Sequence, residues 1–182
     1  MTPMTDVLQR SLHASAAAHP LLAGVAVFCA NDLLFVLLLA LAAVAWQGRA
    51  RVTWGFAARA LLSGVVAALL TLALKGVIVD VRPYVAEGYL PLAHAASDNG
   101  FPSDHTLVAA LLAGWAWWIH PRALPVFVAG TVAVLLGRLA IGAHHTLDVL
   151  GSLLYALLGL AAGTLWRPAG TWTARTVLPA KR

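Results

Sequence analysis

The sequence predicts an all-α protein, a polytopic membrane helix bundle of five or six helices. Composition is the first indication, because 61% of the 182 residues are hydrophobic and only 10% are charged, whereas soluble domains are roughly half apolar and about a quarter charged. The second indication is a series of long apolar runs, and the third is the uneven placement of arginines between them. The length fits one integral membrane domain over 1–182, with 1–20 as an interfacial N-terminal segment.

Most of the apolar runs reach the roughly 20 residues that a membrane-spanning helix needs. The third run is shorter and can cross by tilting or by lying inside the bundle. Ahead of the first run, residues 4–18 are expected to form a short amphipathic surface helix. The runs lie at 21–46, 56–79, 104–119, 124–141 and 146–166.

Two polar residues, Asn31 and Asp32, interrupt the first run. Either Asp32 faces the interior of the bundle, or residues 21–30 lie in the membrane interface and the span begins near Leu33. The sequence leaves both interpretations open. The single Cys29 cannot form an intrachain disulfide, so cysteine content says nothing about the redox compartment.

Basic residues gather in alternate connections between the runs. The connections 46–59, 120–125 and 166–182 contain no acidic residue, whereas the other connections hold six of the seven acids. The positive-inside rule therefore predicts that the first set is cytoplasmic, including a cytoplasmic tail at 167–182, and that the other loops face outward. Positive charge spread over three short connections does not predict nucleic-acid binding. The first set holds Arg49, Arg51, Arg59, Arg122, Arg167, Arg175, Lys181 and Arg182.

One cluster on the outward side has the pattern R-x5-H-x3-D, formed by Arg138, His144 and Asp148. In a helix, His144 and Asp148 would lie one turn apart on one face. The carboxylate would then fix the tautomer of the imidazole and leave its other nitrogen as a nucleophile. Arg138 supplies a planar fork for phosphate oxygens. The alternative is a structural pair at a helix end.

A second cluster, Pro102-Ser103-Asp104-His105, begins the third apolar run. Free N–H groups and the positive dipole at a helix start favour an anion. His105 would then lie beside a bound phosphate as a general acid. The alternative is an ordinary helix cap, made by Ser103 or Asp104, with an interfacial histidine.

A third cluster joins Lys75 to Arg82-Pro83. Seven helical residues advance about 10 Å, so both cations reach one site if the helix persists, although Pro83 disfavours helix beyond Arg82. A lysine inside an apolar run is costly and therefore a functional candidate. The alternative is a side chain that snorkels to the interface.

Taken together, the three clusters favour phosphoryl transfer, which needs cations, an in-line nucleophile and an acid for the leaving group. The sequence has no Cys/His set with metal-ligand spacing and no P-loop motif, so neither a metal nor a cofactor is predicted.

The motifs at 75–83, 102–105 and 138–148 resemble, in order, the signature of the type 2 phosphatidic acid phosphatase family within the vanadium haloperoxidase superfamily. The segments F-P-S-D-H-T, H-A-A-S-D, D-V-L-G-S and H-P-L-L resemble its bacterial undecaprenyl-diphosphate phosphatase, or bacitracin-resistance, branch; they lie at 101–106, 94–98, 148–152 and 19–22. The resemblance implies an acid phosphatase/vanadium haloperoxidase-like helix bundle.

The resemblance implies that His144 is the nucleophile and forms a phosphohistidine, that Asp148 orients it, and that His105 protonates the leaving group. It implies hydrolysis of undecaprenyl diphosphate without a metal, at the periplasmic face of a bacterial inner (cytoplasmic) membrane, in the recycling of the peptidoglycan lipid carrier. Another lipid phosphate (phosphatidic acid, phosphatidylglycerol phosphate or a lipid A phosphate) is the alternative substrate, and a non-catalytic lipid carrier or transporter is the alternative class. The oligomeric state stays open. The phosphate would be held by Lys75, Arg82 and Arg138, with the backbone around Ser103 and Asp104.

Two residues depart from the family pattern. Gly137 replaces a serine, which removes a hydroxyl donor, and Asp104 replaces a glycine, as is usual in the undecaprenyl-type branch. His145 has the wrong spacing from Arg138 for the nucleophile. His94 is either an auxiliary residue or a loop histidine.

Overall fold

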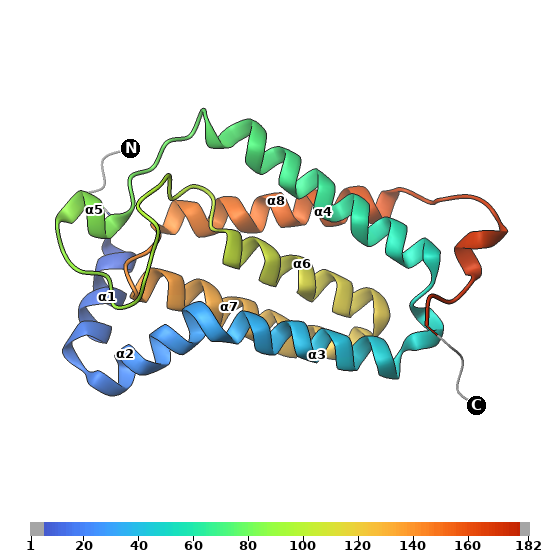
Figure 1. The fold of residues 1–182 in the computed structure, drawn as a ribbon, viewed down its shortest axis with the longest axis horizontal. Helices are drawn as coiled ribbons and strands as arrows, with labels where there is room; N and C mark the ends of the chain where they lie inside the picture. Colours follow the sequence, from blue (N-terminus) through green and yellow to red (C-terminus); the bar gives the residue numbers. More distant parts are fainter. Residues whose placement is uncertain (1–5, 179–182) are drawn as a thin grey trace.

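The structure, a computed structural model, describes residues 6–178, and within that range it contains helices and no β-strand (Figure 1). The predicted all-α class is therefore confirmed. Predictions for residues 1–5 and 179–182, including Lys181 and Arg182, lie outside the described residues. The helices are α1 (Val7–Ala18), α2 (Pro20–Val27), η2 (Phe28–Asp32), α3 (Leu33–Gln47), η3 (Arg49–Arg51), α4 (Trp54–Lys75), α5 (Pro83–Glu87), α6 (Asp104–Ile119), η4 (Pro121–Ala123), α7 (Leu124–Ala140), α8 (Thr146–Leu165) and η5 (Thr171–Ala174).

Among residues 6–178, four helical segments have the length and hydrophobicity needed to cross a bilayer: Pro20–Gln47, Trp54–Lys75, Pro121–Ala140 and Thr146–Leu165. The protein is therefore a multi-pass membrane protein. The shorter α6 lies inside the bundle, where it packs against α3, α4, α7 and α8. Its buried residues, among them Ala109, Leu112 and Ala116, form the core with Phe127 and Val134.

The bundle has two distinct ends (Figure 1). The connections 76–103 and 141–145, together with α1, form what we call the loop end. The connections 48–53 and 120–123 and the segment 166–178 form what we call the arginine end. The basic connections thus meet at one end, as the alternating pattern predicts, while the membrane side of each end stays a prediction.

The first long segment is continuous but contains one π-helical turn, η2. Asp32 is exposed there, so the interpretation that Asp32 faces the bundle interior is wrong. The neighbouring Asn31 takes that place, because its Oδ1 accepts a hydrogen bond from Arg138. The extra residue of a π-turn re-aims the side chains around it, which explains why sequence spacing selected the wrong one of the two.

Helix α1 forms within the predicted range 4–18, of which residues 4 and 5 are not described. It is more than a surface helix, because Gln9 and Ala16 are buried against the bundle. Gln9 Nε2 donates to the Tyr89 hydroxyl at 3.0 Å, and the Asp6 carboxylate accepts from the Thr146 hydroxyl at 2.8 Å. Helix α1 therefore covers the loop end and braces the start of α8.

Candidate active site

His144 lies in the tight connection between α7 and α8 and is only 3% exposed. Gly142 takes φ 84° in this turn, a left-handed conformation that favours glycine. The Nδ1 atom of His144 lies 2.9 Å from the Gly100 carbonyl oxygen. A carbonyl only accepts, so Nδ1 carries the proton and Nε2 keeps its lone pair.

Two arginines converge on that lone pair. Arg82 Nη1 and Arg138 Nη2 each lie 3.3 Å from His144 Nε2, and both side chains are buried. Burial lowers the pKa of His144, and the charges of Arg138 and Arg82 lower it further, so the ring is neutral at physiological pH. A phosphorus atom approached by Nε2 would carry its oxygens between two fixed guanidinium groups.

Asp148 is fully buried, and its Oδ2 lies 3.4 Å from His144 Nδ1. The expectation that the pair shares one helix face is wrong in detail, because α8 begins at Thr146, after His144. The Gly100 carbonyl oxygen accepts the hydrogen bond from the ring N–H instead, and Asp148 Oδ2 accepts from the backbone N–H of His145 at 2.8 Å. Asp148 thus lies beside the His144 ring and fixes the turn that carries it.

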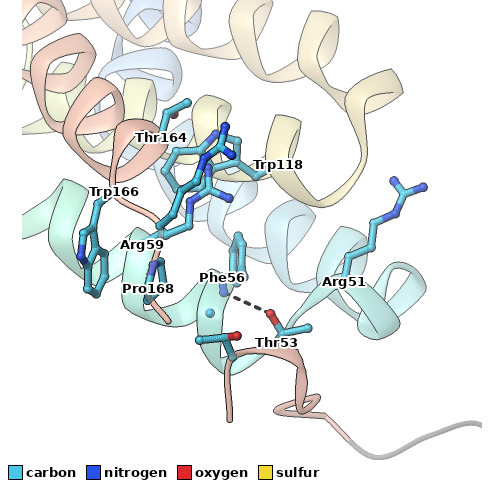
Figure 2. A pocket seen from close by; sticks show the side chains of 11 residues that line it. Arg51, Thr53, Phe56, Arg59, Trp118, Thr164, Trp166 and Pro168 are labelled. Carbon is cyan, nitrogen blue, oxygen red and sulfur yellow. Dashed lines mark hydrogen bonds between the residues drawn. The ribbon is translucent and has the colours of Figure 1, made fainter. Parts of the chain in front are cut away.

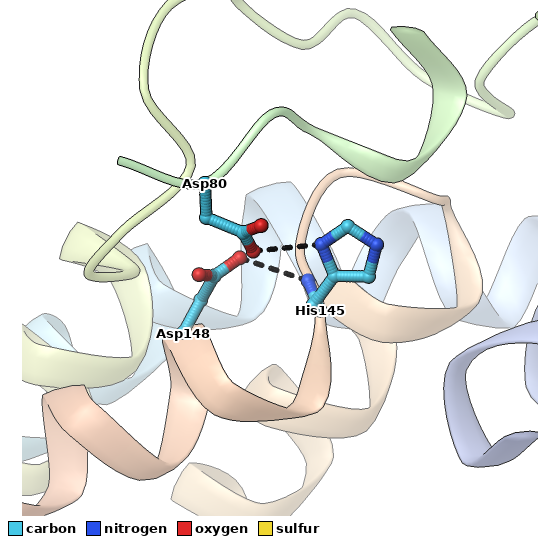
Figure 3. A group of neighbouring side chains, drawn as sticks. All are labelled: Asp80, His145 and Asp148. Atoms are coloured by element: carbon cyan, nitrogen blue, oxygen red, sulfur yellow. Dashed lines mark hydrogen bonds and ion pairs between the residues drawn. The ribbon is translucent and has the colours of Figure 1, made fainter. Parts of the chain in front are cut away.

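His145 faces a second carboxylate, Asp80 (Figure 3). Its Nδ1 donates to Asp80 Oδ2 at 2.7 Å, and the Asp80 carbonyl accepts from the Gly100 N–H at 2.8 Å. Burial opposes ionisation of Asp80, but the hydrogen bond and charge of His145 and a hydrogen bond with Asp148 together lower the pKa of Asp80. Burial likewise acts to lower the pKa of His145, but the hydrogen bond and charge of Asp80 and the other nearby carboxylates together raise it. Asp80 was assigned no role from the sequence. The feature that could have indicated one is its position two residues before Arg82.

One ligand atom from each of Asp80, His145 and Asp148 lies within 4.8 Å of the other two. Two carboxylates and a histidine are residue types that also bind metal ions. Here the Nδ1 proton and the backbone N–H of His145 already occupy the carboxylate oxygens that face them (Figure 3). The three residues form a hydrogen-bonded cluster beside His144, and Asp80 also accepts from the N–H of Gly100, whose carbonyl accepts from His144.

Lys75 and Arg82 are brought together by a carboxylate, not by a helix. Helix α4 ends at Lys75, so the condition that one helix carries both cations is not met. Asp98 lies 3.4 Å from Lys75 Nζ and 2.8 Å from Arg82 Nη2, and the hydrogen bond from Arg82 lowers the pKa of Asp98. The Lys75 side chain is 45% exposed and lies at the end of its helix. Asp98 was assigned no role from sequence, although it ends the segment H-A-A-S-D.

The start of α6 is tied to the start of α8. The Ser103 N–H donates to the Asp148 carbonyl at 3.3 Å, and Ser152 Oγ donates to the Ser103 carbonyl at 2.8 Å. Ser103 does not cap α6 with its side chain, so the first-turn N–H groups stay available to an anion. His105 lies in this first turn and is partly exposed, and Asp104 is exposed.

His94 and Gly137, both singled out by the sequence, lie in different settings. His94 is exposed in the 76–103 connection and makes no hydrogen bond with the residues that the structure describes. Gly137 has a structural reason: a Cβ atom there would lie 2.6 Å from the Ala30 backbone nitrogen. Glycine in place of the family serine thus allows η2 to lie close against α7. In that position, Asn31 of η2 accepts a hydrogen bond from Arg138.

Comparison with known proteins identifies the family of this chain. Residues 56–172 match the PAP2 superfamily, a stretch that contains all three motif clusters. The chain belongs to the PAP2 superfamily. It is therefore a member of a phosphatase family, and the resemblance carried by the three motifs is confirmed.

Two relatives are similar over different lengths. One, of Escherichia coli (strain K12), bears the name "Putative undecaprenyl-diphosphatase YbjG" and is 31% identical over 168 residues, covering 87% of this chain and 81% of the relative. The other, "Undecaprenyl-diphosphatase BcrC" of Bacillus subtilis (strain 168), is 31% identical over 99 residues, covering 53% of this chain and 50% of the relative. No solved structure matches.

Proposed function

We propose that this PAP2 protein hydrolyses undecaprenyl diphosphate to undecaprenyl phosphate and phosphate through a phosphohistidine on His144. The observation that carries the proposal is the position of His144 Nε2, 3.3 Å from one terminal nitrogen of Arg82 and of Arg138. The printed names of the two relatives support the choice of substrate.

In the proposed reaction, His144 Nε2 attacks the terminal phosphorus and the bond from that phosphorus to the bridging oxygen breaks. The electron pair leaves with undecaprenyl phosphate, to which His105 gives a proton. Water then attacks the phosphohistidine, His105 takes the proton from that water, and phosphate departs. Arg82 and Arg138 neutralise the transferred phosphoryl group, while Lys75 and the first turn of α6 serve the leaving phosphate.

Phosphate release by the purified protein tests the substrate. The panel comprises undecaprenyl diphosphate, phosphatidic acid, phosphatidylglycerol phosphate and a lipid A phosphate, and the highest kcat/KM is expected for undecaprenyl diphosphate. Overexpression should also raise bacitracin tolerance. Equal or better kcat/KM for phosphatidic acid, without that phenotype, would transfer the assignment to a broader lipid phosphatase, and absence of turnover on the whole panel would favour a carrier.

Vanadate and acid-quench trapping test the mechanism. Vanadate adopts the trigonal-bipyramidal geometry of the pentacoordinate transition state, and such mimics bind far more tightly than substrates. Turnover is expected to be sensitive to vanadate and insensitive to chelators, and quenched enzyme is expected to carry acid-labile phosphate. Loss of turnover in a chelator would overturn the metal-free mechanism.

A periplasmic active site is tested by labelling. In a Cys29→Ala background, cysteines at Leu90, which is 88% exposed at the loop end, and at Arg175, which is exposed at the arginine end, report on opposite ends. An impermeant thiol reagent added to intact cells should label the cysteine at position 90 alone. The reverse pattern would reverse the orientation of the site.

A further inference from the structure

A second site of distinct character lies at the arginine end. A cavity of about 560 Å³ opens there between α4, α6 and the chain that follows α8, lined among others by Arg59, Trp118, Thr164 and Arg167 (Figure 2). The described residues include all seven acidic residues of the chain, and none of these lines the cavity. The cavity therefore presents positive charge without an internal counter-ion.

Arg59 is held in place at this cavity. Its Nε donates to the Gly163 carbonyl at 2.7 Å, and its guanidinium carbon lies 4.6 Å from the centre of the Trp118 ring. Its two terminal nitrogens make no hydrogen bond with residues 6–178, and exposed Arg167 makes no ion pair within the same range. Arg51 also lines the cavity, but its Nη1 donates to a carbonyl of α6 and its side chain extends away from Arg59 (Figure 2). Arg59 and Arg167 both keep terminal nitrogens that are open to an anion.

A groove continues from this cavity along the bundle. It has a volume of about 630 Å³, lies between α6, α7 and α8, and is lined almost wholly by apolar side chains such as Ala113, Val128 and Leu157. Trp118 and Thr164 border both the groove and the cationic cavity. The cationic cavity and the apolar groove therefore adjoin at these two residues, and together they form one surface with arginines at one end and apolar side chains along the rest.

We propose that this surface binds one phospholipid with an anionic, phosphate-bearing headgroup, whose phosphate contacts Arg59 and Arg167 and whose acyl chain lies in the α6–α8 groove. Charge complementarity and the shared border at Trp118 carry the assignment, because a soluble anion would leave the groove unfilled and a neutral lipid would leave the two arginines unpaired. Orientation of the protein in the membrane needs positive charge on one side but does not require arginines beside an apolar groove. Arg49 and Arg122 lie in the same basic connections, where they add positive charge without lining the cavity.

The test measures lipid binding by the full-length protein in a neutral detergent, using native mass spectrometry with phosphatidylglycerol and phosphatidylcholine. Phosphatidylglycerol is expected to bind at least about tenfold more tightly, as a lost pair of charge-assisted contacts implies. The double variant Arg59→Gln/Arg167→Gln should reduce phosphatidylglycerol binding to the phosphatidylcholine level. The charge-matched control Arg49→Gln/Arg122→Gln should retain the preference. Equal losses in the two double variants would show general surface attraction and overturn the site.

A second arm separates a lipid from its headgroup. Ala161→Phe places a large side chain in the groove, and Leu154→Phe places the same side chain on an exposed position of α8 outside it. The first change is expected to weaken phosphatidylglycerol binding severalfold and the second to leave it unaltered. Competition by soluble glycerol phosphate at the same concentration as the lipid, or indifference to Ala161→Phe, would overturn the lipid assignment. Because no turnover is measured, the result is independent of the proposed hydrolysis.

Discussion

The two ends of the bundle hold arginines in opposite settings. At the loop end, Arg82 and Arg138 are buried and hydrogen-bonded to Asp98 and Asn31, and both approach Nε2 of His144, the proposed nucleophile. At the arginine end, the cations are more exposed, and no acidic residue lies among the lining of their cavity. Catalysis needs donors that are fixed before charge develops, whereas orientation in the membrane needs only positive charge on one side. Equal substitutions at the two ends should therefore have very unequal effects on turnover.

The largest effect is expected for His144→Ala. Removal of the nucleophile should lower kcat by about 10⁴-fold or more and abolish acid-labile phosphoenzyme, because no other group can take over the covalent step. His145→Gln is the control, since its ring faces Asp80 and not the arginine pair; a loss of no more than about tenfold is expected. If His145→Gln removed the phosphoenzyme while His144→Ala kept it, the assignment of the two histidines would be reversed.

Arg138→Gln should reduce kcat/KM by about 10²- to 10³-fold, the usual cost of losing one fixed donor to a developing charge. The same change at the other end, Arg59→Gln, should leave kcat/KM within about twofold. Steady-state phosphate release from undecaprenyl diphosphate measures both. A comparable loss in the two variants would mean that the ends are not functionally distinct.

The pH profile sharpens the same contrast. Burial, then Arg138 and Arg82, lower the pKa of His144, so its neutral, nucleophilic form persists as pH falls below about 6.5, where an ordinary histidine is protonated. The acid limb of kcat/KM should therefore lie below that pH in the wild type and move to higher pH in Arg138→Gln. Because both enzymes use the same substrate, its own ionisation cancels in the comparison. An unmoved or lowered limb in the variant would show that Arg138 does not act on His144.

The sequence predicts the helices and most of the candidate site residues, because apolar runs and short motifs are local features of the chain. Four of the five predicted apolar runs coincide with helices that are long and apolar enough to cross a membrane, and the three motifs contain His144, Arg82 and Arg138, which the fold brings together. Contacts between distant segments are a different matter. The hydrogen bond from His144 to the Gly100 carbonyl and the ion pairs of Asp98 join connections far apart in sequence, and no spacing rule contains them.

The incorrect expectations share one physical cause, namely that helices were extended beyond their ends. Lys75 and His144 both lie at helix boundaries, where loops and not helical periodicity set the side-chain positions. In the π-turn η2, likewise, Asn31 and not Asp32 faces the interior of the bundle. Helix ends and π-turns often occur at functional sites, so periodicity is least informative where the chemistry is.

Gly137→Ser restores the family residue and is expected to destabilise the fold, not to improve it. The new Cβ would meet the backbone of η2, and overpacking of this kind costs about 1–3 kcal/mol. Thermal unfolding of the purified protein measures the loss. Gly24→Ser is the matched control, because a Cβ at Gly24 has no neighbour within 4 Å. A variant as stable as the wild type, with higher activity, would show that a serine hydroxyl fits at the loop end after all.

The smallest effect, about 1 kcal/mol, is expected from Asp80→Asn and should depend on pH. Asp80 raises the pKa of His145 above its unfolded value of about 6.5. The stabilisation from this pair is therefore fully present below that pH and is lost as pH rises through the folded pKa. Asp6 and Asp148 also face His145 and are unchanged in the variant, so the difference in unfolding temperature between wild type and Asp80→Asn should be larger at pH 6 than at pH 9.

Glu87→Gln removes an exposed ion pair with Arg10 that contains no histidine, and its effect should be equal at both pH values. A pH-independent difference for Asp80→Asn would mean that this aspartate holds the turn by shape alone and that its charge does not reach His145.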